Sequence, residues 1–307
     1  MVISAQHHRS VAENATGDLT NSYGVKAGYA QAILHLLADA ERGLDVDSVN
    51  ERWSQPIEFQ LGQAKITARI EDAASKINLA AMVDDKGAPN DAVVDELKRL
   101  LRASGHAEDV ALRVLDYQDT DTKGDFEAGA RNARLTSLDE LARIDGVEHE
   151  VLYGGDARAG ILKHLTLWPH EAPQGSPSGQ INVNTAPVEV LQTLDDDMTP
   201  QLASEIAAHR MRRAADGSPD HFKAVGDLAN VQGMTQKLLS VITSRCTVKS
   251  PAFEIRVTSA VAAVEKRWLY VVTRAAAQGQ GKPTVTLASH QRETEARSVK
   301  APEVKDE

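Results

Sequence analysis

The chain has 307 residues, of which 42% are hydrophobic and 4% aromatic, and its formal net charge is −10. This length is enough for one large domain or two, with a core built mostly from Ala, Val, Leu and Ile. The negative charge argues against a duplex nucleic-acid binder, which normally carries an excess of basic residues. The single cysteine, Cys246, excludes an intrachain disulfide and a zinc site made of several thiolates.

The sequence contains neither a membrane span nor a secretory signal peptide. No window reaches the roughly 18 apolar residues that a spanning helix needs. At the start of the chain, Val2-Ile3 is followed at once by polar residues, which a signal peptide would not have there. The chain as written is therefore expected to be soluble.

The N-terminal segment, residues 1–46, is predicted to form a long helix. Its apolar residues Val25, Tyr29, Ile33 and Leu36 recur at spacings of three and four, which is typical of one helix face. Two interpretations remain open at this point. The segment is either an ordinary amphipathic helix packed on a core, or the second half of a longer helix whose apolar half is missing.

Alternating apolar and polar residues predict strands in two distant regions, 47–81 and 250–289. In the first region, two alternating runs flank Gly62-Gln63, which indicates a hairpin. Because an isolated hairpin is marginally stable, we expect the strands of the second region to join it in one antiparallel sheet. Residues 290–307 are polar and charged, and we expect them to form a disordered tail.

Residues 82–249 show almost no alternation and are predicted to form an all-helical domain inserted between the strands, which makes the fold class α+β. The insert contains an internal repeat, because residues 138–147 resemble residues 225–234. A second pair of similar segments is 76–79 and 180–184. The glycine shared by the first pair can turn the chain between two short helices.

The segment 181–248 carries the most specific pattern in the chain and resembles the helix-hairpin-helix repeat of DNA-uptake receptors and DNA repair proteins. In DNA-binding members, a glycine-rich hairpin and the following helix N-terminus hold a phosphate. Here the first hairpin carries Asp195, Asp196 and Asp197 instead. Since three carboxylates repel a phosphate, the segment is interpreted as a module for packing or protein contact.

A nucleic-acid-binding protein is the alternative function that this segment leaves open. It requires a fold that turns the hairpin carboxylates away from the ligand. The same fold must expose the basic residues Arg210, Arg212 and Arg213 in their place.

A cluster of carboxylates is the candidate metal site. Five of them lie within twelve residues: Asp116, Asp119, Asp121, Asp125 and Glu127. Carboxylates at this spacing repel one another unless a hard cation such as calcium neutralises them. The loop is not an EF-hand, because Lys123 and Ala130 occupy two ligand positions of that motif. The alternative to a calcium loop is a solvated acidic turn.

No catalytic residue is expected, and the protein is not predicted to be an enzyme. None of the ten histidines has the spacing of a zinc-binding motif. The segment 175–179 contains a proline, which argues against a nucleophile elbow. Cys246 has no evident histidine partner. Calcium is the one cofactor that the residues suggest.

Four motifs, taken in order, resemble the K-type minor pseudopilin of the bacterial type II secretion system (general secretion pathway protein K). They are Glu71–Leu79, Asp116–Asp121, Leu138–Leu141 and Ile181–Pro187. The resemblance covers roughly residues 10–275. It implies a pilin-like fold, in which a long N-terminal helix lies on a small antiparallel sheet. It also implies a large helical insertion, here with helix-hairpin-helix-like (SAM-like) units.

The same resemblance implies a role at the tip of the type II secretion pseudopilus, in pseudopilus assembly and protein export. The I-type and J-type minor pseudopilins are the implied partners, exported proteins are further ones, and no nucleic acid is expected. Calcium binding in the helical domain is a family property, which we carry over to the acidic residues above. Val25, Tyr29, Ile33 and Leu36 would then pack against neighbouring pilin helices.

This sequence departs from the family pattern in two places. The family begins with a basic leader, a prepilin peptidase site and an apolar helix, and none of these is present. Met1-Val2-Ile3 resembles the last stub of that helix, so we expect either a truncated N-terminus or a mis-set start of the sequence. A location in the inner membrane facing the periplasm is implied by the resemblance alone. The second departure is the alanines at 73, 74 and 80, where the family tends to have acidic, Gly or Asn residues.

Overall fold

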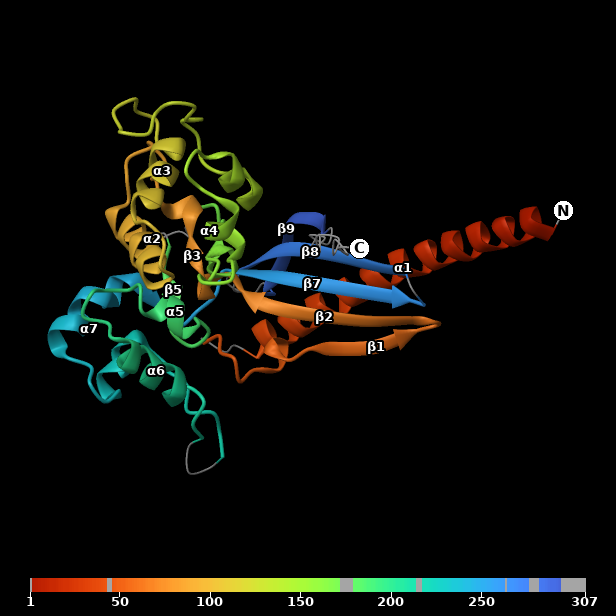
Figure 1. Ribbon diagram of the computed structural model, residues 1–307. Helices are drawn as coiled ribbons and strands as arrows, with labels where there is room; N and C mark the ends of the chain where they lie inside the picture. Colours follow the sequence, from red (N-terminus) through yellow and green to blue (C-terminus); the bar gives the residue numbers. More distant parts are fainter. Residues whose placement is uncertain are drawn as a thin grey trace, which may run out of the picture.

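The structure is a computed structural model that describes residues 2–42, 46–171, 179–213, 217–262, 264–275 and 282–293, with the backbone alone before residue 15. It combines one long helix, a five-stranded antiparallel sheet and a helical domain at one end of the sheet (Figure 1). The predicted α+β class with an antiparallel sheet is confirmed.

The sheet is built from strands that lie far apart in the sequence. Its strands, in spatial order, are β1 (Ile57–Leu61), β2 (Ala64–Asp72), β7 (Ala252–Val261), β8 (Val264–Ala275) and β9 (Thr284–Glu293). Alternate residues of β2 are buried, as its apolar and polar alternation requires. Asp72 at the end of β2 is paired with Phe253 of β7, so the helical domain leaves and rejoins the sheet at adjacent points.

Helix α1 (Val2–Glu41) lies across one face of the sheet and extends past it at the N-terminus (Figure 1). Two glycines allow the helix backbone to approach the strands closely. A Cβ on Gly24 would lie 2.2 Å from Ser259 Oγ, and a Cβ on Gly28 would lie 2.5 Å from Val257 Cγ1. The glycines therefore permit a contact that larger residues would block.

The helical domain contains two units whose elements follow the same order, except that the first unit has an additional 3-10 turn, η3. The first unit comprises β3 (Ile77–Asn78), η3 (Leu79–Ala81), α2 (Asp91–Ala103), α3 (Asp109–Gln118), η4 (Leu138–Arg143), α4 (His149–Tyr153), η5 (Leu162–His164) and β4 (Leu165–Thr166). The second comprises β5 (Ile181–Asn182), α5 (Val188–Leu191), α6 (Pro200–His209), η6 (Val225–Asn230), α7 (Gln236–Ile242), η7 (Thr243–Arg245) and β6 (Cys246–Thr247). In each unit the first strand pairs in parallel with the last. The two copies of the 138–147 repeat lie at equivalent places, in η4 and η6 and the turns after them.

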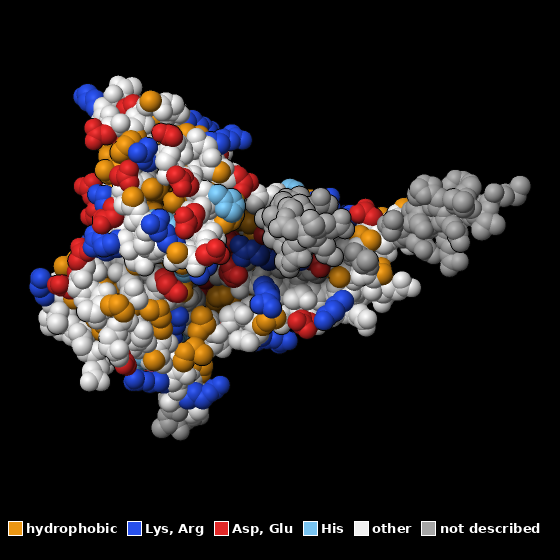
Figure 2. Space-filling view, in the orientation of Figure 1, with side chains coloured by type: hydrophobic (Ala, Val, Ile, Leu, Met, Phe, Trp, Pro, Cys, Tyr) orange, Lys and Arg blue, Asp and Glu red, His pale blue; other side chains and the backbone are white. Residues whose placement is uncertain are grey.

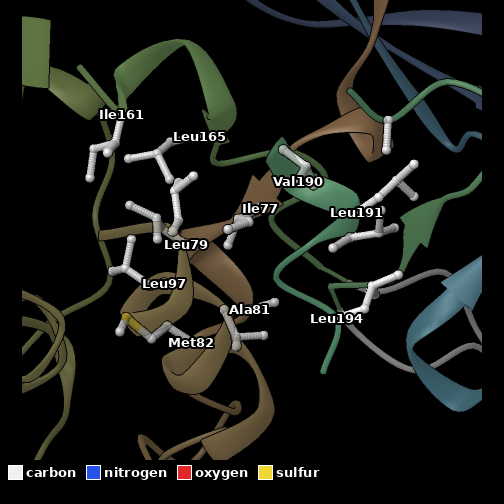
Figure 3. Close-up of a cluster of buried hydrophobic side chains, with 14 of the residues drawn as sticks. Ile77, Leu79, Ala81, Met82, Leu97, Ile161, Leu165, Val190, Leu191 and Leu194 are labelled. Atoms are coloured by element: carbon white, nitrogen blue, oxygen red, sulfur yellow. The ribbon is translucent and has the colours of Figure 1, made fainter. Parts of the chain in front are cut away.

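The two units share one hydrophobic core. Figure 3 shows Ile77 and Leu97 of the first unit in the same cluster as Val190, Leu191 and Leu194 of the second. A separate cluster lies between α1 and the sheet. The molecule therefore has two cores, one for the helix and sheet and one for the two units together.

Two expected boundaries differ in the structure. Residues 77–81, assigned to the sheet region from the sequence, pack in the core of the helical domain, because β3 pairs with β4. Strand β9 continues to Glu293, beyond the expected start of the tail at residue 290. The remaining part of the expected tail, residues 294–307, lies outside the described residues.

Candidate functional site

The loop after α3, residues 119–132, brings three of the five predicted carboxylates together. One oxygen each from Asp119, Asp121 and Glu127 lies within 4.8 Å of the others. Asp119 is only 5% exposed. Its Oδ1 atom and the Oε1 atom of Glu127 are buried without a hydrogen-bond partner in the described part of the chain. This group of oxygens is what a hard cation such as calcium prefers as ligands.

The electrostatics of this loop also fit a cation. Burial raises the pKa of Asp119 to about 6, and the neighbouring carboxylates of Asp121, Glu127 and Asp116 raise it as well. Without a positive charge, the loop therefore holds carboxylates that repel one another, and they are partly shielded from solvent. A bound divalent cation would stabilise the ionised carboxylates.

The other two predicted ligands, Asp116 and Asp125, are not part of the group of three. Asp116 Oδ2 accepts a hydrogen bond of 2.9 Å from the backbone N–H of Phe126. A Cβ on Gly124 would lie 2.1 Å from the same oxygen, so Asp116 shapes the turn. Asp125 is exposed and lines a cavity of about 180 Å³ together with Arg113 and others.

Asn132 is a loop residue that the sequence reasoning missed. It has a positive φ of 52°, which is uncommon for a residue other than glycine. Its backbone N–H donates to the Tyr117 carbonyl oxygen at 3.0 Å, and its Nδ2 donates to the Asp121 carbonyl oxygen at 2.9 Å. Its Oδ1 atom is buried and unpaired within the described residues. No spacing rule signals such a residue, because its role depends on how the loop closes.

The four residues of the predicted partner interface lie on the side of α1 that packs against the sheet of the same chain. Val25 and Leu36 are buried against the protein's own sheet. Tyr29 and Ile33 are partly buried in the same cluster, and the Tyr29 ring stacks on Tyr270 with centroids 4.4 Å apart. The apolar face was assigned to a partner, but the sheet of the same chain covers it.

A different face of α1 carries exposed apolar side chains. Leu19, Tyr23 and Leu34 are 58%, 59% and 56% exposed. At 100° per residue, these three positions fall on one side of the helix. This face, which we call the outer stripe, is more than half exposed at all three positions in the described part of the chain, and a second helix could cover it.

The carboxylates of the acidic hairpin in the second unit bond to basic residues of the same chain. Asp196 accepts from Arg99 at 3.0 Å and from Arg102 at 3.1 Å, and Asp197 accepts from Lys237 at 3.0 Å. Figure 2 shows acidic and basic side chains interleaved over the helical domain on this face. The basic surface that nucleic-acid binding would need is also incomplete, because Arg210 is buried.

A second group of carboxylates lies where α1, the sheet and the helical domain meet. It contains Asp39, Asp47 and Glu51. Arg274 donates to Asp39 at 2.8 Å and also bonds to Asp47. Burial raises the pKa of Asp47 to about 6 and that of Glu51 to about 7. Donors of the protein itself already hold this group, so it serves as a structural junction.

Cys246 lies in β6 and is buried. Burial is the main cause that raises the pKa of its thiol well above the usual range. A thiol in this state is a poor nucleophile.

Among the described helices, none combines the length and the apolarity that crossing a bilayer requires.

Residues 181–249 match the family model described as Type II secretion system (T2SS), protein K. No curated protein matches the sequence. This matched segment contains the whole second unit.

The fold of the whole chain is similar to that of a protein in a solved structure. That structure is the crystal structure of the GspK-GspI-GspJ complex from the enterotoxigenic Escherichia coli type 2 secretion system. The sequences are 17% identical, the TM-score is 0.70, and the match covers 94% of this chain and 100% of that chain. Together the two matches confirm the predicted resemblance to K-type proteins, and neither supports the nucleic-acid-binding alternative.

Proposed function

We propose that this protein acts as a K-type minor pseudopilin at the tip of the type II secretion pseudopilus, in pseudopilus assembly and protein export. The observation that carries the proposal is the match of residues 181–249 to the protein K family model. The similar fold over 94% of the chain supports it. In this role it is a structural protein without catalytic activity, on the periplasmic side of the inner membrane.

The architecture supports a pilin-like interpretation of one part of the chain. Helix α1 and the sheet form the pilin-like part, and the two units are helix-hairpin-helix-like (SAM-like) modules. We place the boundaries of the helical domain at residues 73 and 249, because β2 ends at Asp72 and β7 begins at Ala252. A domain of this size at one end of the sheet would obstruct another subunit from stacking above it.

The proposed partners are I-type and J-type minor pseudopilins, and exported proteins are further candidates. The support is that the similar fold belongs to a protein crystallised in a GspK-GspI-GspJ complex. In the present structure, the outer stripe of Leu19, Tyr23 and Leu34 is the surface that a partner helix would cover. This replaces the interface expected from the sequence.

We also propose that the loop 119–132 binds calcium. The ligands would be Asp119, Asp121 and Glu127, with Asn132 closing the loop beside them. The support is that Asp119, Glu127 and Asn132 each keep a buried oxygen without a hydrogen-bond partner among the described residues. A cation would satisfy such oxygens and neutralise the carboxylates.

Co-purification with the two partner proteins tests the proposed function. The protein is co-expressed with the I-type and J-type proteins of the same system and analysed by size-exclusion chromatography. We expect one complex containing all three, and elution of the protein alone would contradict the proposal. The double variant Tyr23→Glu, Leu34→Glu should lose the complex. The variant Gln31→Glu adds a charge at another exposed position of α1 and should keep it.

A further inference from the structure

Strand β9 (Thr284–Glu293) forms one of the two edges of the five-stranded sheet (Figure 1). It pairs with β8 on one side. Among the described residues, no backbone group of β9 bonds to backbone outside that pairing. In an antiparallel pair, about half of the N–H and C=O groups of an edge strand point away from its neighbour. Strand β9 therefore presents a row of donors and acceptors that a further strand can use.

The two edge strands differ in their protection against such pairing. The other edge strand, β1 (Ile57–Leu61), has five residues and carries Glu58. In β9, the stretch Thr284–Gln291 contains no Lys, Arg, Asp, Glu or Pro. Short length, charged side chains and proline are the features by which natural edge strands avoid pairing with other chains. The contrast indicates that β9 is the edge open to a partner.

A bulge limits the open part of β9 to its first residues. The register between β8 and β9 shifts between Val271 and Val272, which leaves Ala288 without a counterpart. Such a bulge bends the strand and interrupts its ladder. The part after the bulge ends with an arginine and a glutamate, whereas the part before it is uncharged. A partner strand therefore finds a regular, uncharged run at Thr284–Leu287, which we call the open edge.

The open edge is apolar on the side of the sheet that α1 covers. Val285 lies opposite Arg274 of β8, and Leu287 lies opposite Val272. Val272 is buried in the cluster between α1 and the sheet, and Val285 packs against the same cluster. Since opposite residues of paired strands share a face, Leu287 lies on this side as well. Leu287 is nevertheless 44% exposed, so α1 leaves room beside it.

The other side of the open edge carries hydroxyl groups. Thr284 and Thr286 are exposed there. A strand paired with this edge places apolar side chains beside Leu287 and polar side chains beside the threonines, and cross-strand pairs of both kinds stabilise a sheet. A charged side chain set beside Leu287 would lose hydration without gaining a counterion. The edge therefore favours an uncharged strand in which apolar residues alternate with Thr or Ser.

We propose that the open edge binds an extended segment of a partner polypeptide, which joins the sheet as a sixth strand. The segment alternates apolar residues with Thr or Ser and carries no charge over the paired residues. An extended polypeptide has N–H and C=O groups at the spacing of the row on β9, and this match sets the class of the partner. The proposal does not depend on the role in secretion.

Binding of a designed peptide to the unaltered protein is the first test. The probe is an acetylated and amidated peptide with a central Thr-Val-Thr-Val-Thr segment between Gly-Lys ends. The control peptide carries an N-methyl group on every central residue, which removes the donors and keeps the side chains. Titrations are followed by NMR of the backbone amides in ¹⁵N-labelled protein. We expect saturable shifts at residues 284–287 with the probe alone. No saturable shift there, or equal shifts with both peptides, overturns the proposal.

Variants then test whether the open edge is the binding surface. Leu287→Lys should weaken binding of the probe by about fivefold or more, because a charge on an edge strand opposes pairing. Gln60→Lys places the same residue at an exposed position of β1 and should change binding less than about twofold. Equal weakening by both variants overturns the assignment to β9. If Leu287→Lys does not fold, Thr286→Lys tests the same run from its other side, with the same expected loss.

Two measurements without the probe distinguish other occupants of the open edge. Analytical ultracentrifugation over a range of concentrations reports self-association. A dimer that Leu287→Lys disrupts would identify a second copy as the occupant and overturn the proposal. Hydrogen exchange at residues 284–287 is also compared between the full chain and a chain that ends at Glu293. Protection that is lost in the shorter chain would assign the edge to residues 294–307 and overturn the proposal as well.

Discussion

The two helical units share one order of elements but place opposite charges at the same position. The residue that follows the second helix is Asp119 in the first unit and Arg210 in the second. Both side chains are more than nine-tenths buried, and each keeps a polar atom without a partner among the described residues. The difference teaches that the repeated backbone supplies a buried position, and the residue there decides the sign of the buried charge.

A second matched pair shows how the units differ in their attachment to the sheet. The Oδ1 atoms of Asn78 and Asn182 accept from the backbone N–H two residues further on, each at 3.0 Å. The Nδ2 of Asn78 donates to the Pro169 carbonyl oxygen at 2.8 Å. The Nδ2 of Asn182 contacts three acceptors outside its own unit, including Asp72 Oδ2 at 2.9 Å. Asn182 therefore ties the second unit to the end of β2, whereas the first unit bonds to β7 through Thr166, which donates to Glu254 at 3.1 Å.

Alanine at these two positions gives the largest expected difference between the units. Asn182→Ala should lower the free energy of unfolding by about 3 kcal/mol, because it leaves several buried groups unpaired. Asn78→Ala should lower it by about 1.5 kcal/mol, since fewer partners are lost. Urea unfolding measures both. Equal losses would show that the second unit has no special role at the junction.

Calcium should stabilise the first unit only. At a calcium concentration of about 100 times Kd, a site present only in the native state adds about 2.7 kcal/mol. Thermal unfolding in EDTA and then in excess calcium measures the effect, and hydrogen exchange locates it at residues 119–132. Asp119→Asn should abolish the rise, while Asp125→Asn should keep it, because Asp125 lies outside the ligand group. A rise that survives Asp119→Asn would place the ion elsewhere.

In the calcium-free protein, a change of pH should alter the contribution of Asp119 to stability but leave the charge of Arg210 unchanged. The pKa of Asp119 is raised from 3.8 to about 6, so the native state binds its proton more tightly than the unfolded chain does. The resulting stabilisation is present below about pH 4 and is lost as the pH rises through about 6. Arg210 stays charged over this range, because its lowered pKa is still about 10.

The difference in the free energy of unfolding between the unaltered protein and Asp119→Asn, measured as a function of pH, isolates the contribution of Asp119. Asp47 and Glu51 also have raised pKa values and shift stability in the same direction in both proteins. We expect the Asp119 contribution to reach about 1–2 kcal/mol between pH 7 and pH 4 in EDTA. Parallel stability curves for the two proteins would refute it.

The smallest effect is expected at the exposed hairpin of the second unit. Asp197 pairs with Lys237 at 3.0 Å, but both side chains are more than half exposed. Exposed ion pairs contribute little to stability and are screened by salt. Asp197→Asn should therefore leave the urea midpoint unchanged within error. A clear loss would mean that the hairpin supports the unit more than its exposure suggests.

Local patterns predicted the longer elements and missed those that depend on distant partners. The hairpin around Gly62-Gln63 was predicted because its alternation extends over several residues on each side, and β1 and β2 confirm it. Strands β3 and β4 have two residues each, which is too short for any period to appear. They exist because the fold brings them side by side.

The candidate sites could be predicted to a similar extent. Clustered acidic residues pointed to the loop after α3, but only the folded loop separates Asp119 from Asp116. The sequence treats Arg210 as one of three basic neighbours, and burial alone sets it apart from Arg212 and Arg213. For α1, the spacing identified an apolar face, but spacing cannot tell whether the protein's own sheet or a partner covers that face.

The adjacent entry and exit points of the helical domain have a consequence for the order of folding. Pairing β2 with β7 closes a loop that contains all of residues 73–251, and closing a long flexible loop is entropically unfavourable. Contacts within the two units are more local and form sooner. Once the helical domain has folded, its two ends already lie side by side, and the remaining loop is short. We therefore expect the helical domain to form first and to act as the nucleus on which the central strands of the sheet come together.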